Sequence, residues 1–481
     1  MNKPVGAVYD RALFLLCSVV LTMSILSACN AGPNYRRPVV PAPPVFRGSD
    51  GSTAPVDVSS LGDLKWFEVF KDEQLQELIR TALVQNHDVQ EAAARVDAAR
   101  ANLGITRADQ VPNIDATTDV TTVRLSNQGA FPFPAAVRPD RTFGSAALSL
   151  LSFEVDLWGR LRRATEAARA DLLASEQSRR AVFTTLVSDT AAAYFDLLGL
   201  DAQLEIARRT LATRQESLRL ITVRNQGGIA TDLDLRQAEQ LVYGASATIP
   251  EIERQIEQTE NRISLLVGAN PGPITRGRPL AQQEQPPSVP AGLPSSLLER
   301  RPDIRAAEQN LIAANAIIGV ARAAYFPSVT LTGFFGFTSN ELSNLFSRGT
   351  RVWEFVPQVS QPIFAGGRIK SNVKLAEAEQ QIALAQYERT IQTAFREVSD
   401  ALVDHRKVKE VRAQLEMLVK TLQERSRLAY VRYEGGVDTL LNALDADRDL
   451  FTAELTLTLT SRDELVALVQ LYKALGGGWQ Q

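Results

Sequence analysis

Few residues of this chain have the chemistry that an enzyme needs. Its 481 residues include only two histidines, His87 and His405, and two cysteines, Cys17 and Cys29. The histidines stand in different predicted elements, and no metal-ligand spacing, phosphate-binding glycine loop or paired nucleophile and base accompanies them. A formal net charge of −3 gives no electrostatic basis for binding nucleic acid. We therefore expect no enzyme, no metal site, no bound cofactor and no nucleic-acid partner.

The first 28 residues have the pattern of a secretory signal. Lys3 and Arg11 precede an apolar run that is too short for a spanning helix, and Leu26-Ser27-Ala28 leads to Cys29. This arrangement resembles a bacterial lipoprotein signal, which implies that Cys29 becomes the first mature residue and carries an N-acyl chain and S-diacylglycerol. By the same resemblance, Asn30 favours sorting to the outer membrane. An ordinary secretory signal with an incidental cysteine is the alternative.

The rest of the chain consists of two similar repeats. Gly159-Arg160 recurs as Gly367-Arg368, and Gly227-Gly228 recurs as Gly435-Gly436, in both cases 208 positions further on. Self-similarity over so long a period indicates a duplicated domain rather than a short-repeat solenoid.

The duplication and the composition together predict the domain boundaries. We expect a lipidated, proline-rich tether over 29–60 that leads away from the lipid. A first repeat then covers 61–269 and a second covers 295–475. A proline-rich linker without helical or strand period joins the repeats at 270–294, and 476–481 forms a flexible tail.

Each repeat contains a predicted β-hairpin, at about 113–154 and about 328–361. In the second, Val329 and Leu331 alternate with Thr330 and Thr332, which is typical of strands with one apolar and one polar face. A soluble antiparallel sheet explains this alternation equally well, but the lipoprotein start favours transmembrane strands. Four strands cannot close a barrel, so the chain must associate. The residues alone leave two, three or four copies open.

Each repeat also contains a predicted helical hairpin, at about 160–267 and about 367–475. The first helix of each is close to 100 Å long at about 1.5 Å per residue. Apolar residues spaced by alternating threes and fours predict a packed seam along the first helix, with Arg214 as its one polar member. The same spacing predicts a seam on the second long helix, first through Ile391, Phe395, Val398 and Leu402 and then through Val411, Leu415, Leu418 and Leu422. The glycine pairs mark the turns.

The segment after the linker carries a family resemblance. Arg300-Arg301-Pro302-Asp303-Ile304-Arg305-Ala306-Ala307-Glu308, followed by Phe326-Pro327, resembles the signature of the TolC-like outer-membrane factors, in the lipoprotein (NodT-type) branch that serves resistance-nodulation-division efflux pumps. Gly32-Pro33-Asn34-Tyr35 and Gly476-Gly477-Gly478-Trp479 are similar to that branch as well. The similarity extends over essentially the whole mature chain.

The resemblance implies an α+β membrane protein that forms a homotrimer. Three chains would build a twelve-stranded transmembrane β-barrel in outer-membrane lipid, continued by a long periplasmic α-helical barrel with a belt of shorter helices. The implied function is the passive exit duct of a tripartite multidrug efflux pump. Its implied partners are a periplasmic adaptor protein and a proton-driven inner-membrane transporter. A duct for protein secretion or metal-ion efflux, or a structural envelope lipoprotein without a channel, remain the alternatives.

The resemblance also implies a gate at the periplasmic tip. The family motif Asp-Ala-x-Arg matches Asp445 and Arg448, with Leu441 one turn earlier, and Gln237 stands at the corresponding place in the first repeat. Three symmetry-related carboxylates on one axis would repel one another and attract cations. Without the resemblance, an ordinary exposed ion pair explains the same spacing. Adaptor docking is expected at both turns, around Arg224, Gly227, Gly228, Arg432, Gly435 and Gly436.

Overall fold

The computed structural model describes residues 30–41, 43, 46–47, 60–124, 140–284 and 294–479. The predicted signal and Cys29 lie outside these residues. The chain divides into two compact units, each described by itself. The first, here the sheet unit, comprises Met1–Val39, Val96–Ala174 and Ala307–Tyr387. The second, the hairpin unit, comprises Val40–Arg95, Ser175–Ala306 and Glu388–Gln481.

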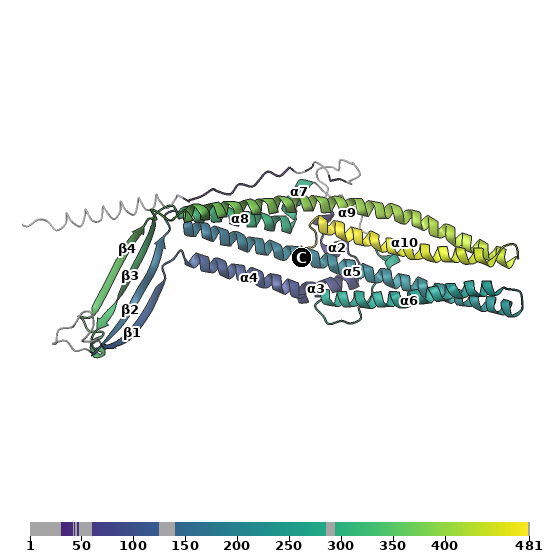
Figure 1. The fold of residues 1–481 in the computed structure, drawn as a ribbon, viewed down its shortest axis with the longest axis horizontal. Coiled ribbons are helices and arrows are strands. Elements are labelled where there is room, and N and C mark those ends of the chain that lie inside the picture. The colour runs from purple at the N-terminus through teal and green to yellow at the C-terminus, as the bar shows by residue number, and fades with distance from the viewer. Residues whose placement is uncertain are drawn as a thin grey trace, which may run out of the picture. The chain divides into compact units, whose positions relative to one another are not determined.

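The sheet unit contains one antiparallel sheet of four strands in the order β1-β2-β3-β4 (Figure 1). The strands are β1 (Ile114–Arg124), β2 (Asp140–Val155), β3 (Ser328–Ser339) and β4 (Arg351–Ser360). Each repeat contributes one hairpin, and β2 pairs with β3 to join the two repeats into one sheet. Among the described residues, β1 and β4 each have a strand on one side only.

The register gives the sheet one apolar and one polar face. Partners across the strands share a face, so Ile114 and Leu150 lie together, and Phe335 lies beside Trp353. The opposite face carries mainly small, hydroxyl and carboxylate side chains such as Asp115. This confirms the alternation that the sequence predicts. No helix in the described part of the chain has an apolar stretch of the length that a bilayer requires.

The long helices occur in equal pairs. α5 (Arg160–Gln226) and α9 (Arg368–Glu434) each have 67 residues, and α6 (Asp232–Leu266) and α10 (Leu440–Ala474) each have 35. Figure 1 shows α6 folding back along α5 and α10 along α9. The shorter helices are η1 (Leu61–Asp63), α2 (Trp66–Val69), α3 (Glu73–Gln85), α4 (His87–Ala108), η2 (Leu280–Gln282), α7 (Pro294–Arg300), α8 (Pro302–Ala323) and η3 (Leu342–Asn344).

The seam predicted on α5 is confirmed, whereas the one predicted on α9 is partly wrong. Leu197, Ala207 and Ile221 of α5 are buried in apolar clusters. On α9, however, Val411 and Leu418 are about half exposed. The buried positions there are Val419 and Ser426, which share a face with the part-buried Leu415 and Leu422. Ile391 and Val398, in the first part of the predicted seam, are fully buried.

The tail predicted to be flexible is packed as far as the structure describes it. Gly476, Gly477 and Gly478 are buried, and Trp479 packs against the main apolar cluster of the hairpin unit. A Cβ on Gly477 would lie 2.2 Å from the ring of Tyr472, so only glycine allows this approach. The glycine run serves close packing rather than mobility.

The start of the predicted tether is also held in place. Residues 30–41 are extended, but Arg163 of α5 donates to Asn34 Oδ1 at 2.7 Å, and Tyr35 Oη donates to Glu308 Oε1 of α8 at 3.2 Å. Because α5 and α8 come from different repeats, this segment ties the two repeats together within the sheet unit.

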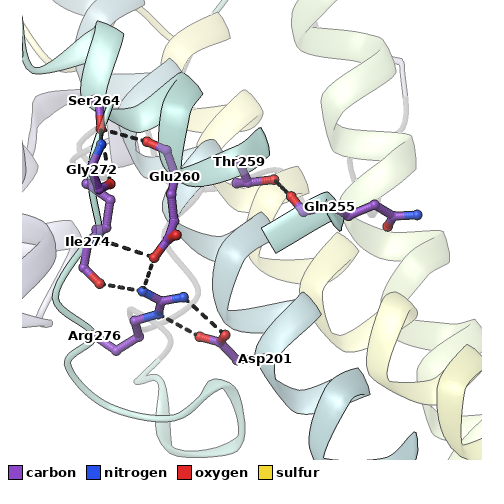
Figure 2. Close-up of polar contacts among 8 residues, drawn as sticks. All are labelled: Asp201, Gln255, Thr259, Glu260, Ser264, Gly272, Ile274 and Arg276. Carbon is purple, nitrogen blue, oxygen red and sulfur yellow. Dashed lines mark hydrogen bonds and ion pairs between the residues drawn. The ribbon is translucent and has the colours of Figure 1, made fainter. Parts of the chain in front are cut away.

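The linker between the repeats is fixed to the hairpin unit by a polar network (Figure 2). Arg276 donates to Asp201 of α5 at 2.9 Å, to Glu260 of α6 and to the carbonyl of Ile274. Ser264 receives a hydrogen bond from the amide of Gly272 at 3.3 Å. Residues 285–293 of the predicted linker lie outside the described residues.

Asp72 is the second anchor of the linker. Its buried carboxylate caps α3 by accepting from the amides of Gln74 and Leu75, and it also accepts from Tyr194 Oη at 3.3 Å. From the linker, Asp72 accepts hydrogen bonds from the amide of Arg278 at 3.0 Å and from Gln283 Nε2 at 2.8 Å. Burial alone raises the pKa of Asp72, but these hydrogen bonds leave that pKa lowered on balance. Ionised Asp72 therefore stabilises the fold at neutral pH.

Candidate functional site at the hairpin tips

Both helical hairpins turn in the same way. After α5, the amide of Ile229 donates to the carbonyl of Arg224 at 2.8 Å and that of Gly228 donates to Asn225 at 2.9 Å. After α9, the equivalent bonds run from Val437 to Arg432 and from Gly436 to Tyr433, both at 3.0 Å. This is the Schellman pattern, which satisfies the last helical carbonyls and needs a left-handed residue.

Only the second glycine of each pair has that left-handed conformation. Gly228 has φ 74° and Gly436 has φ 69°, while Gly227 and Gly435 keep negative φ. A Cβ on Gly228 or Gly436 would meet nothing within 4 Å, so the requirement at these two positions is conformational.

The arginines predicted to serve docking are engaged in different ways. The guanidinium of Arg224 lies 5.2 Å from the ring centre of Tyr433, so it links the first hairpin to the second. Arg432 forms an ion pair with Asp438 across its own turn at 3.0 Å. Hydrogen bonds from Arg432, Asn442 and the amide of Thr439 hold the pKa of Asp438 below its usual value.

Each tip exposes four large apolar side chains at matching positions. Their exposed fractions lie between 46% and 78%. The first hairpin presents Leu220, Val223, Ile229 and Leu233, and the second presents Leu428, Val431, Val437 and Leu441. All four pairs are separated by 208 positions, so the repeat preserves the exposed surface as well as the turn.

The predicted gate residues share one exposed face of α10. Asp445 Oδ1 lies 3.2 Å from Arg448 Nη1, and Leu441 stands one turn before Asp445. An adjacent face of α10 is buried, because Leu440 and Leu444 pack with Ile221 and Ala238 of the first hairpin. The structure thus brings the three predicted residues together and directs them away from the core.

A buried ion pair lies directly behind this face. Arg214 of α5 donates to Asp447 Oδ2 of α10 at 2.7 Å, and the two side chains are only 6% and 13% exposed. Arg214 also donates to the carbonyl of Leu241 in α6 at 3.1 Å, and its guanidinium lies 4.9 Å from the ring centre of Phe451. Burial, together with Asp447, raises the pKa of the neighbouring Tyr430 in α9. This cluster connects all four long helices.

Sequence reasoning missed Asp447. Arg214 stood out as the polar member of a seam, and a buried arginine requires an anion. Its partner is 233 positions away, however, and nothing local distinguishes Asp447 from the three other aspartates at 438, 445 and 449.

The chain matches the family model described as "Outer membrane efflux protein" over residues 78–269 and 293–477. The chain belongs to the outer membrane efflux protein family. It is 39% identical over 469 residues to the probable efflux pump outer membrane protein TtgC of Pseudomonas putida, covering 97% of this chain and 96% of that one. It is also 39% identical to outer membrane protein OprJ of Pseudomonas aeruginosa, covering 96% of each chain.

A solved relative shows the same fold. The MtrE outer membrane channel of Neisseria gonorrhoeae, determined in its open state, superposes with a TM-score of 0.84 at 33% identity, covering 94% of this chain and 99% of that one. This member of the efflux family is therefore an outer-membrane efflux channel with the duplicated α+β fold of the TolC-like channels. Among the described residues, no group of His, Cys, Asp or Glu side chains is arranged to hold a metal ion.

We predict that Asp447→Asn destabilises the hairpin unit by about 3 kcal/mol or more, because it leaves Arg214 buried without a counter-charge. The measurement is urea unfolding followed by helical circular dichroism. Asp449→Asn is the matched control, because its pair with Arg425 at 2.8 Å is exposed and contributes about 0.2–1 kcal/mol. Equal losses of unfolding free energy in the two variants would contradict a larger contribution from the pair of Arg214 with Asp447.

Proposed function

We propose that this efflux channel is the passive exit duct of a tripartite multidrug pump. The observation that carries the proposal is the combination of an amphipathic sheet with two helical hairpins that have matching tips. The sheet suits a bilayer, and the hairpins supply a second, water-facing part with repeated contact points. The energy for transport would come from the inner-membrane partner.

The duct would be a homotrimer. The sheet has an apolar face, and β1 and β4 leave backbone groups unpaired at its two edges among the described residues. In lipid such groups cost several kcal/mol each, so β1 of one copy should pair with β4 of the next. Three copies would give twelve strands, which is wide enough for an aqueous path, whereas eight strands are filled by side chains.

The partners would be a periplasmic adaptor and an inner-membrane transporter of the resistance-nodulation-division class. The pump names of the relatives support this assignment over protein secretion. The matching apolar tips support the adaptor as the direct contact, because the two hairpins of each chain then offer two similar docking surfaces.

The exposed face of α10 would form the gate. Among the residues that the structure describes, Asp445 forms one ion pair, with Arg448, and both side chains are substantially exposed. Around a threefold axis the three copies of Asp445 would raise the electrostatic barrier to anions and hold cations, and Leu441 would narrow the same level. Gln237 at the matching place in the first repeat leaves one such carboxylate per chain.

We predict that Asp445→Ala combined with Arg448→Ala increases the single-channel conductance in planar bilayers several-fold, because the charged constriction is removed. Glu424→Ala with Arg427→Ala is the matched control, since it removes another exposed ion pair with the same spacing of three from the same hairpin. A large wild-type conductance that the first double substitution leaves unchanged would place the gate elsewhere.

We predict that Ile229→Asp with Val437→Asp abolishes drug efflux in cells while the purified channel keeps its conductance, because the adaptor would lose an apolar contact at both tips. Drug susceptibility and bilayer conductance are measured on the same variant. Tyr243→Asp is the control, because Tyr243 is 67% exposed on α6 but stands away from the turn. Normal efflux by the tip variant would contradict docking at these residues.

Cys29 would carry the covalent lipid that anchors the channel. The signal-like residues before it and the packed segment that begins at Asn30 support this proposal. We predict that radiolabelled palmitate is incorporated into the wild-type chain and that Cys29→Ser abolishes incorporation. Labelling that persists in the variant would contradict lipidation at this residue.

A further inference from the structure

The helix α6, which returns along α5 from the first tip, has a weak stretch in its interior. Gly244 and Pro250 both lie inside this helix. Pro250 has no amide hydrogen, so the carbonyl of Ser246, four residues earlier, receives no helical hydrogen bond from it. Between them, Thr248 donates its hydroxyl to the carbonyl of Gly244 at 3.0 Å. Glycine, proline and such hydroxyl bonds all lower the resistance of a helix to bending.

Threonines occupy the equivalent positions of α10, the return helix of the second hairpin. The glycine, threonine and proline of α6 correspond, 208 positions later, to Thr452, Thr456 and Thr458. Each of these hydroxyls donates to the carbonyl four residues earlier, at 3.0, 2.8 and 2.9 Å respectively. Thr458 bonds to the carbonyl of Glu454, which is the repeat equivalent of the carbonyl that Pro250 leaves without a donor. The same backbone hydrogen bond is therefore absent in α6 and in competition with a hydroxyl in α10.

The threonines of α10 belong to a dense run. Thr460 and Ser461 make the same kind of bond, at 3.0 and 2.8 Å, so that five hydroxyls within 452–461 bond to carbonyls of their own helix. On the long helix α9 such a bond is isolated, as at Thr421, and α9 contains no glycine and no proline. We name the two weak stretches the soft segments, 244–250 and 452–458.

The soft segments lie where one apolar cluster ends and the next begins. The cluster at the tips reaches Leu241 on α6 and Leu444 on α10. The main cluster of the hairpin unit includes Ile249 on α6 and Phe451 on α10. Because interlocked side chains resist separation, a bend between the two clusters disturbs fewer of them than a bend within either cluster.

The parts of the two hairpins beyond the soft segments are held together. Ile221 of the first hairpin packs with Leu440 and Leu444 of the second. The gate residues Leu441 and Asp445 and the exposed apolar side chains of both tips lie on this side of the soft segments. A bend at the soft segments would therefore displace the gate and both tips together.

We propose that the two soft segments form a hinge at which both hairpins of a chain bend when the periplasmic mouth opens and closes. The proposal rests on the gate proposed above and adds the place at which the helices bend. The turns lie further from the soft segments than the gate residues do. A partner that moves the tips would therefore have leverage on the gate.

Hydrogen–deuterium exchange of the wild-type, full-length channel in detergent tests the soft segments directly. Backbone amides within 244–250 and 452–458 should exchange several-fold faster than those of 412–418, a largely exposed stretch of α9, because weakened helical bonds open more often. Equal or slower exchange in the soft segments would overturn the hinge.

A stiffened variant tests the hinge in cells. Gly244→Ala with Pro250→Ala removes the weak points of α6, and Thr452→Ala with Thr458→Ala removes the equivalent points of α10. A Cβ on Gly244 would meet nothing within 4 Å, so alanine fits there without a clash. Drug efflux should fall several-fold, while the amount of trimer in the membrane stays unchanged. Normal efflux by the stiffened variant would overturn the proposal.

The matched control makes the same kinds of change in α4, away from the hairpins. A Cβ on Gly104 would also meet nothing within 4 Å, and Thr106 also donates to the carbonyl four residues earlier, at 2.9 Å. Gly104→Ala with Thr106→Ala should leave efflux unchanged. A loss as large as that of the stiffened variant would show that helix stiffening in general, and not a hinge in the hairpins, causes the defect.

Removal of the gate separates the hinge from a general structural defect. Adding Asp445→Ala with Arg448→Ala to the stiffened variant should restore efflux, because a mouth without its gate does not need to bend. A defect that these two substitutions do not restore would overturn the hinge. Failure of the proposed gate gives a different result, since the same two substitutions would then leave the conductance of the otherwise wild-type channel unchanged.

Discussion

The backbone groups at the two edges of the sheet are the constraint on which the rest of the structure depends. β1 and β4 each have one strand neighbour among the described residues, and the sheet between them has an apolar face. In lipid an unpaired amide or carbonyl costs several kcal/mol, and no side chain of the chain repairs a whole edge. The proposed association of copies would cover both edges, because β1 of one copy would pair with β4 of the next.

The duplication gives a simple route to that completion. Because each repeat contributes one β-hairpin and one helical hairpin of equal length, the contact between repeats inside the chain can recur between chains. Buried polar groups fix the linker and the helical hairpins in place within the hairpin unit. Asp72 and Arg276 fix the linker to the hairpin unit, and the pair of Arg214 with Asp447 holds the two helical hairpins in one register. A partner that separates the tips must work against this buried pair, since a charge left alone costs about 3–5 kcal/mol.

The sequence predicted those parts of the fold that follow from local periodicity. Alternation of Val329 and Leu331 with Thr330 and Thr332 was sufficient to predict a strand, because a period of two is typical of strands and not of helices. Spacing by threes and fours was likewise sufficient for α5. On α9 the same spacing failed at Val411 and Leu418, because a helix with apolar residues on more than one face does not reveal which face the single chain buries.

The features that the sequence did not predict depend on contacts between residues that are far apart in the sequence. Gly476 to Gly478 suggested mobility, and only the ring of Tyr472 shows why glycine is required there. The gate residues Leu441, Asp445 and Arg448 were named from a motif, and the structure adds that they share an exposed face. Asp447, two residues from Asp445, is buried instead of exposed, because it forms an ion pair with Arg214 of the other hairpin.

The most direct test of the account is a density map of the full-length protein in lipid nanodiscs, obtained by electron cryomicroscopy. The account predicts three copies around one axis, with β1 of each copy paired to β4 of the next and a continuous path that extends from the strands into the helical hairpins. A sheet that remains open at both edges, or a ring of a different number of copies, would contradict it.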